Sequence, residues 1–273
     1  MFRTAVLFAA LTGIFLLVGF LVGGTSGMTL AFIFALAMNL FSYWYSDKIV
    51  LRMYRAKEIS KSQNPKLHKI VEEVAKEAEI PKPKVYMIDT DVPNAFATGR
   101  NPKHASVAVT RGIMKTLDAS ELEAVLGHEI SHVKNRDILT SSIAATLGGA
   151  IAYIAQMAWF GMMGDRRNNS AALLPMLILA PVAAALVQLA ISRGREYEAD
   201  YKGAILTKNP LGLASALQKI ENSVKERPMK GNSATSSLFI VNPFKADAFA
   251  SLFSTHPPTA ERVERLRQLA KTM

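Results

Sequence analysis

The sequence contains no cysteine and only five histidines among its 273 residues. The absence of cysteine excludes disulfide bonds and thiolate metal ligands, and it is compatible with any redox compartment. Charged side chains are missing from residues 4–46 and, apart from Asp165, Arg166 and Arg167, from residues 138–192. Basic residues do not alternate with aromatic ones in any compact pattern, so the net charge of +10 does not indicate nucleic-acid binding.

The two stretches that lack charge predict four membrane-spanning helices. Each exceeds the roughly 20 apolar residues that cross a bilayer core, and each is interrupted near its middle. The glycine-rich residues 23–27 divide the first stretch, and polar residues 165–169 divide the second. A cleaved signal peptide and a pair of buried core helices are the weaker alternatives for the first and second stretches. The predicted spans are 4–22, 28–46, 138–164 and 171–192.

Basic residues orient these hairpins. An even number of spans puts the basic clusters on one side, which predicts a multi-pass protein of the inner or plasma membrane with its polar parts in the cytoplasm. The net charge fits attraction to the anionic lipid headgroups of that side. Arg166 and Arg167 fall on the opposite side and leave open that the second hairpin does not cross fully. The clusters are Lys48, Arg52, Arg55, Lys57 and Lys61 after span two, Lys134 and Arg136 before span three, and Arg193, Arg195 and Lys202 after span four.

The polar segments combine helical and strand patterns. Residues 64–80 have apolar positions at helical spacing, and Pro81 follows them. Residues 85–88 and 105–109 have the composition of strands, and residues 93–99 fit a further short strand or a loop. His68 lies in the first turn of the predicted helix, where we expect a solvated side chain. The patterns predict a mainly α fold with a small β-sheet.

The most informative motif is His128-Glu129-Ile130-Ser131-His132. Four residues make about one helical turn, so both imidazoles project from one face and can hold one zinc ion. The glutamate between them can act as a general base of a metallopeptidase. The alternative is a solvated helix face that carries two spare histidines.

The motif helix is expected to begin near Asp118, because Glu121 three residues later completes a capping-box pattern. No glycine or proline lies between Asp137 and Gly148, so the helix is expected to continue into the third span. The motif would then stand within a few turns of the membrane surface.

A catalytic zinc ion takes three protein ligands and keeps one open position. Glu196 and Asp200 are four residues apart in the segment that follows the fourth span, so they share a face if that segment is helical. The returning hairpin would bring them close to His132. Simple pairing of these acids with Arg193 and Arg195 accounts for the spacing equally well.

Several motifs in the same order make the chain resemble the HtpX-type integral-membrane zinc metalloproteases. The chain is also similar, more distantly, to the CAAX prenyl proteases. The resemblance covers nearly the whole length. Its motifs are His128-Glu129-x-x-His132 with Asn135 and Asp137, Ser192-Arg193-x-Arg195-Glu196-Tyr197-x-Ala199-Asp200, Asn94-Ala95-Phe96-Ala97-x-Gly99, Ser237 to Pro243, and Ser254-Thr255-His256-Pro257-Pro258 with Arg262.

The resemblance implies a zincin-like α+β protease domain with one Zn²⁺ per chain. It implies Glu196 as the third ligand, beside His128 and His132, and Asp200 as a group that orients a zinc-bound histidine. Asn135 is a further candidate for a group that orients a zinc-bound histidine. The resemblance also implies that His256 approaches the site and donates to the reacting carbonyl. From the residues alone, His256 could equally precede a helix without a catalytic role.

The resulting prediction is a membrane-bound zinc endopeptidase in which Glu129 is the base. The resemblance implies that its substrates are membrane or misfolded polypeptides, cleaved in membrane quality control at the cytoplasmic surface. The alternatives are a CAAX-type processing enzyme, an intramembrane protease, a channel, and a zinc-stabilised scaffold without catalysis. The substrate is expected to extend along Asn94, Ala95, Phe96 and Ala97. The predicted units are the hairpin 1–46, protease part 47–137, hairpin 138–192 and protease part 193–273.

Overall fold

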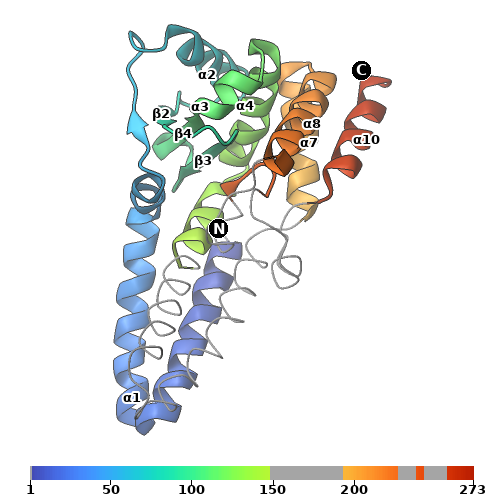
Figure 1. The fold of residues 1–273 in the computed structure, drawn as a ribbon. Helices are drawn as coiled ribbons and strands as arrows, with labels where there is room; N and C mark the ends of the chain where they lie inside the picture. The colour runs from blue at the N-terminus through green and yellow to red at the C-terminus, as the bar shows by residue number, and fades with distance from the viewer. Residues whose placement is uncertain (1, 148–192, 227–237, 243–256) are drawn as a thin grey trace.

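The structure, a computed structural model, describes residues 2–147, 193–226, 238–242 and 257–273. A long helical hairpin projects from a body in which helices pack on a small sheet (Figure 1). The predicted fold class, mainly helical with a small sheet, is confirmed in these residues.

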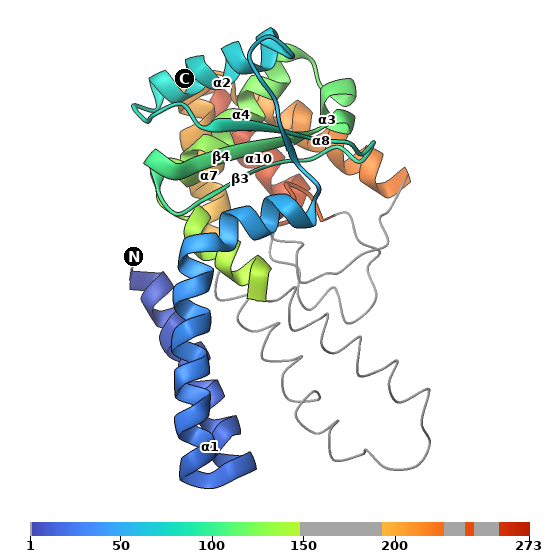
Figure 2. The same ribbon diagram turned by 90° about the vertical axis from the view of Figure 1, so that its left-hand side faces the viewer.

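The hairpin is α1 (Phe2–Met53), which is broken at Gly23 and Gly24. Gly24 has φ of 59°, a left-handed conformation that glycine adopts without steric cost, and this turn lets the chain reverse. The arms Thr4–Leu21 and Gly23–Met53 are long and apolar enough to cross a membrane. Few of their side chains are buried inside the molecule, as expected of surfaces that face lipid. Both views show the arms side by side (Figures 1 and 2).

The first two predicted spans are therefore helical, with the predicted break between them. The third and fourth predicted spans lie outside the described residues, except for the apolar helix Ile138–Leu147. The predicted domain boundaries stay predictions.

The sheet has four strands in the order β1-β2-β4-β3. β2 and β4 are parallel, whereas β1 pairs with β2 and β3 pairs with β4 in the antiparallel sense. The predicted strands are confirmed, and the undecided segment 93–99 contains β3. β1 was not predicted, because two exposed residues carry no periodic pattern. The strands are β1 (Lys57–Glu58), β2 (Lys84–Ile88), β3 (Ala95–Gly99) and β4 (Ala105–Thr110).

Helix α4 lies at the centre of the body, between β3 and the helices α2, α7 and α8 (Figure 1). Helix α10 packs against α7 and α8. The core includes the fully buried side chains of Leu67, Val107, Leu126 and Leu217. The helices are α2 (Pro65–Glu77), α3 (Arg111–Thr116), α4 (Ala119–Lys134), α7 (Arg193–Thr207), α8 (Pro210–Glu226) and α10 (Thr259–Ala270).

The start of α4 matches the prediction, because Asp118 and Glu121 form a complete capping box. The predicted continuation into the third span is wrong. Helix α4 ends at Lys134, Arg136 takes a left-handed conformation with φ of 61°, and a new helix begins at Ile138. The carbonyl of Asp137 accepts the first backbone bond of this new helix, from Ser141.

The expectation for His68 is also wrong. Its side chain is buried, and Nε2 lies 3.0 Å from the carbonyl oxygen of Ile59. The chain before α2 folds back over that helix, a tertiary contact that helical periodicity does not reveal.

Candidate metal centre

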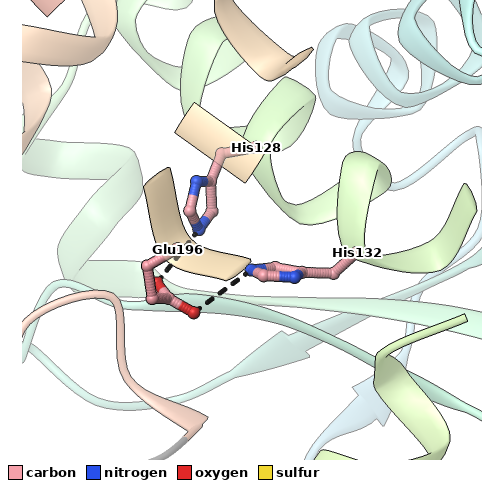
Figure 3. A group of neighbouring side chains, drawn as sticks. All are labelled: His128, His132 and Glu196. Atoms are coloured by element: carbon pink, nitrogen blue, oxygen red, sulfur yellow. Dashed lines mark ion pairs between the residues drawn. The ribbon is translucent and has the colours of Figure 1, made fainter. Parts of the chain in front are cut away.

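Three side chains from two helices converge in one cavity. His128 and His132 project from α4, and Glu196 projects from the first turn of α7 (Figure 3). Glu196 Oε2 lies 3.7 Å from His128 Nε2, and Glu196 Oε1 lies 3.4 Å from His132 Nε2. The three potential ligand atoms lie within 4.8 Å of one another. The i, i+4 spacing on α4 and the return of the chain in α7 thus produce a set of donors typical of a zinc site.

Two glycines allow α4 and α7 to approach this closely. A Cβ atom on Gly203 would lie 2.6 Å from the backbone nitrogen of His128. A Cβ atom on Gly127 would lie 2.6 Å from the methyl carbon of Thr207 and 3.0 Å from the carbonyl oxygen of Gly203. The helices therefore cross backbone to backbone beside the first histidine. Gly203 follows Glu196 by seven residues, two helical turns along the same face.

Each imidazole has a carboxylate behind it. His128 Nδ1 lies 2.9 Å from Asp200 Oδ1, and His132 Nδ1 lies 3.5 Å from Asp137 Oδ2. Protons on the two Nδ1 atoms would satisfy these carboxylates and leave both Nε2 lone pairs facing Glu196. Carboxylates in this position orient metal-binding histidines in many zinc proteins.

Buried arginines hold both carboxylates. Arg262 donates from Nε to Asp200 Oδ2 at 2.8 Å and from Nη2 to Asp200 Oδ1 at 2.7 Å. Burial alone would raise the pKa of Asp200, but the neighbouring Arg262 and the bond from His128 lower that pKa to about 2. Arg195 donates to Asp137 Oδ1 at 3.2 Å. Both carboxylates are therefore ionised at neutral pH.

Glu129 lies in the same cavity with a different environment. Its side chain is buried, Oε2 accepts a hydrogen bond of 2.9 Å from the Ala97 amide, and Oε1 lies 4.0 Å from His128 Nε2. Burial raises the pKa of Glu129, and the negative charge of Glu196 adds to this effect, although the two histidines and the Ala97 amide oppose it. A carboxylate with a raised pKa is suited to accept a proton near neutral pH.

The donor set fits a divalent cation. Burial lowers the pKa of His132, but Asp137, Glu196 and Glu129 reverse this and raise it to about 10. The negative potential that favours a proton on His132 also favours a metal cation beside it. Two imidazoles and one carboxylate suit zinc, which binds nitrogen and oxygen ligands in its catalytic sites.

The predicted substrate residues line the cavity in part. Phe96 and Ala97 of β3 border it, together with Leu238, Phe239 and Ile240. β3 pairs with β4 on one side, and its other side is an edge of the sheet that the described residues form.

Asn94 makes hydrogen bonds within the chain, and its predicted contact with substrate stays a prediction. Its Nδ2 donates to the Leu238 carbonyl at 3.0 Å, and its Oδ1 accepts from the Ile240 amide at 3.1 Å. Its own backbone amide and carbonyl are both bonded to Thr110. Asn94 therefore holds residues 238–240 beside the cavity, and its polar groups have partners within the chain.

Two further predicted site residues remain as predictions. The Oδ1 atom of Asn135 accepts a bond of 2.9 Å from Lys202 Nζ, and among the described residues its side chain makes no hydrogen bond to either imidazole. His256 lies outside the described residues. Asp137 and Arg195 were missed as site residues, although Asp137 was part of the motif, because a continuous helix would have carried Asp137 away from His132.

Comparisons with known proteins agree with this geometry. The family model described as "Peptidase family M48" matches residues 61–270. A "Protease HtpX homolog" of Thermococcus sibiricus is 52% identical over 281 residues, which cover 99% of this chain and 96% of that protein. The "Protease HtpX homolog" of Pyrococcus furiosus is 54% identical over 278 residues, with the same coverage.

Among solved structures, the "Crystal Structure of S. mikatae Ste24p" is similar with a TM-score of 0.55 at 19% identity. The match covers 97% of this chain and 65% of that one. At this level of identity, the similarity concerns the fold alone.

Proposed function

The chain belongs to peptidase family M48 and is a metallopeptidase, and from this premise we propose that it is a zinc endopeptidase that acts on polypeptides at the cytoplasmic surface of a membrane. The observation that carries the proposal is the convergence of His128, His132 and Glu196, with Glu129 in the same cavity. A purely structural metal site would gain nothing from a buried carboxylate at position 129.

His128, His132 and Glu196 would hold one zinc ion, which when bound supplies Lewis acidity that polarises the scissile carbonyl and acidifies water. Glu129 would take the proton from the attacking water and pass it to the leaving amine nitrogen. The Ala97 amide orients the Glu129 carboxylate for this task. Asp200 and Asp137 would keep the imidazoles in the tautomer whose Nε2 atoms face the metal. His256 is proposed to donate to the carbonyl oxygen as negative charge develops there.

The substrate would add a strand to the free edge of β3. An extended peptide pairs with an edge strand through main-chain hydrogen bonds, which places its carbonyls in a row beside the cavity. Ala95, Phe96 and the carbonyl of Ala97 are proposed for this pairing, because the Ala97 amide already donates to Glu129. The engaged polar groups of Asn94 exclude that residue from direct pairing, so the proposed contact is narrower than the four residues predicted. Main-chain recognition of this kind gives broad sequence preference.

The hairpin would anchor the site at the membrane. Its exposed apolar arms suit a bilayer, and the basic residues after the second arm favour the cytoplasmic side. Cleavage of damaged or misfolded membrane proteins is the proposed role, because such substrates expose extended chain near this surface.

The decisive experiment compares the wild type with Glu129→Gln in detergent, with zinc content and casein cleavage measured on the same samples. The variant is expected to keep its zinc and to lose about 10²–10⁴-fold in hydrolysis, the usual contribution of a general base. Zinc-containing wild-type protein without peptidase activity would favour the scaffold alternative. Wild-type rates in the variant would remove Glu129 from its role.

A further inference from the structure

A second and larger cavity lies where the hairpin meets the body. Its volume is about 630 Å³, within the roughly 300–1,000 Å³ range of ligand sites. None of its lining residues borders the metal centre. The hairpin contributes Thr4, Ala5, Phe8 and Tyr43, and the body contributes the segments 79–81 and 100–103 with Arg136 and Leu139.

One part of the lining is cationic. Arg100, Lys103 and Arg136 border the cavity, and the ion pairs of the described residues do not include any of the three. Glu79 is the single acid in the lining, and it is largely exposed and 3.8 Å from Lys134. The cavity thus gathers three positive charges that lack a carboxylate partner among the described residues.

The opposite part of the lining is apolar. Phe8 and Tyr43 project from the two arms of the hairpin, and Leu139 lies in the first turn of the helix that follows Asp137. These side chains continue the apolar surface of the arms, which we have proposed to be in contact with lipid tails. Contact with these apolar side chains would not contribute to the binding of a soluble anion.

The position along the hairpin also indicates the membrane interface. The guanidinium of Arg100 lies 4.7 Å from the ring centre of Trp44, which is half exposed on the second arm. Tryptophan and tyrosine concentrate at the level of lipid headgroups, and arginine there meets phosphate. The cavity therefore presents cations at headgroup depth and apolar side chains below them.

We propose that this cavity binds one anionic phospholipid, with its phosphate between Arg100, Lys103 and Arg136 and its upper acyl chains against Phe8, Tyr43 and Leu139. The proposal rests on the membrane placement of the hairpin and does not depend on proteolysis. A bound lipid would join the hairpin to the turn at residues 135–137. That turn carries Asp137, which contacts His132 of the metal centre.

The test uses the full chain purified in detergent and native mass spectrometry with added phosphatidylglycerol or phosphatidylcholine. We expect the wild type to bind phosphatidylglycerol at least tenfold more tightly. The triple variant Arg100→Gln/Lys103→Gln/Arg136→Asn should lose this preference at least tenfold. Asparagine is chosen at position 136 because it tolerates the left-handed backbone there. Equal binding of the two lipids, or a triple variant that behaves as the wild type, would overturn the proposal.

A matched control separates the site from net charge. Lys66→Gln/Arg267→Gln/Lys271→Gln removes three exposed cations outside the cavity and should bind phosphatidylglycerol as the wild type does. Loss of phosphatidylglycerol binding in this control would mean that the overall charge of the protein, and not this cavity, determines the binding. Helix content by circular dichroism and a single elution peak show that each variant is folded.

A third arm distinguishes a lipid from a free phosphate. Glycerol 3-phosphate is offered as a competitor, and Phe8→Ala tests the apolar wall. We expect glycerol 3-phosphate to compete at least a hundredfold more weakly than the lipid. Phe8→Ala should weaken binding of the lipid and leave binding of glycerol 3-phosphate unchanged. Equal competition by glycerol 3-phosphate would contradict a lipid site. If hydrolysis fails but lipid binding follows this pattern, the proposed function falls and the lipid site stands.

Discussion

Asp200 and Asp137 occupy equivalent places behind the two imidazoles, but at different distances. Asp200 lies 2.9 Å from His128 Nδ1 and is gripped by two bonds from Arg262, whereas Asp137 lies 3.5 Å from His132 Nδ1 and receives one bond from Arg195. From the shorter distance and the two bonds from Arg262, we expect Asp200 to contribute more than Asp137 to holding its imidazole in place.

We therefore expect Asp200→Asn to weaken zinc binding by about 10–100-fold, the usual loss when such a carboxylate is changed. Asp137→Asn should weaken it less. Competition with a chromogenic chelator measures both affinities. Glu198→Gln is the control, because Glu198 lies on the same helix but pairs at the surface with Lys202. A larger loss in Asp137→Asn than in Asp200→Asn would contradict this ranking.

At the level of single residues, the sequence predicts what local spacing determines. His128 and His132 share a helix face wherever that helix lies, and Glu196 and Asp200 do so on α7. The role of Asp137 could not be predicted, because it depends on a left-handed Arg136 in a segment without glycine or proline. The support from Arg262 arrives from a helix more than 60 residues further along the chain, a pairing that no local pattern shows.

At the level of helices, the close crossing of α4 and α7 decides whether the ligands meet. Gly203→Ala should shift α7 away from the His128 backbone, because the new Cβ would lie 2.6 Å from a backbone nitrogen that cannot move alone. We expect a loss of about 1–3 kcal/mol in stability, as for other overpacked sites, together with weaker zinc binding. Denaturant unfolding and zinc titration measure the two effects.

The control for this crossing is Gly13→Ala in the hairpin, where a Cβ would meet nothing within 4 Å. It should leave zinc affinity unchanged. If Gly203→Ala binds zinc as tightly as the control, the crossing is not what sets the distance between Glu196 and the histidines.

Glu121 joins α4 to α8 by charge. Its side chain is buried, and its Oε1 lies 2.6 Å from Lys219 Nζ. The same oxygen accepts a hydrogen bond of 2.7 Å from Ser215 Oγ. Burial raises the pKa of Glu121, but the bonds from Lys219 and Ser215 outweigh burial, and the net shift is downward. A lowered pKa means that ionised Glu121 stabilises the fold above its unfolded pKa of about 4.3 and that this stabilisation is lost as pH falls through the folded pKa.

Glu121→Gln is therefore expected to destabilise the metal-free protein by about 1–3 kcal/mol at pH 7. The difference from the wild type should shrink as pH falls below about 4.3. Denaturant midpoints between pH 7 and pH 3.5 test this, with the exposed Glu77→Gln as the control. A difference that stays constant with pH would show that charge at position 121 is not the cause.

Elements with strong local signals were predicted, and those set by tertiary contacts were not. The cap of α4, the helix α2, and the strands β2 and β4 follow from capping residues and apolar spacing. The end of α4 lies at a left-handed Arg136 that no glycine or proline marks, and the short strand β1 depends on pairing with β2, so sequence patterns could not place them.

At the level of the whole molecule, the metal centre connects parts of the chain that are distant in sequence. α4 supplies two of the proposed ligands and α7 the third, while Arg262 of α10 binds Asp200. The sequence predicted this approach from the returning hairpin, but it singled out Glu196 as a ligand only through the resemblance, since spacing alone left Glu196 and Asp200 equally suited to pair with arginines. In the structure, Arg262 of α10 binds Asp200, and Glu196 faces the histidines with its Oε2 4.0 Å from Arg262 Nη2.

Removal of the metal should therefore loosen the whole body. A ligand at 1,000 times its dissociation constant stabilises the folded state by about 4.1 kcal/mol, so chelation is expected to lower the unfolding temperature by several degrees.

Because the pKa of His132 in the metal-free protein is raised to about 10, that imidazole is protonated at pH 7, and zinc must displace the proton. Zinc binding should thus release about one proton at pH 7 and strengthen as pH rises toward 10. Calorimetry in buffers of different ionisation enthalpy measures this release. Glu129→Gln should retain most of it, whereas binding without proton release would mean that His132 is neutral before the metal arrives.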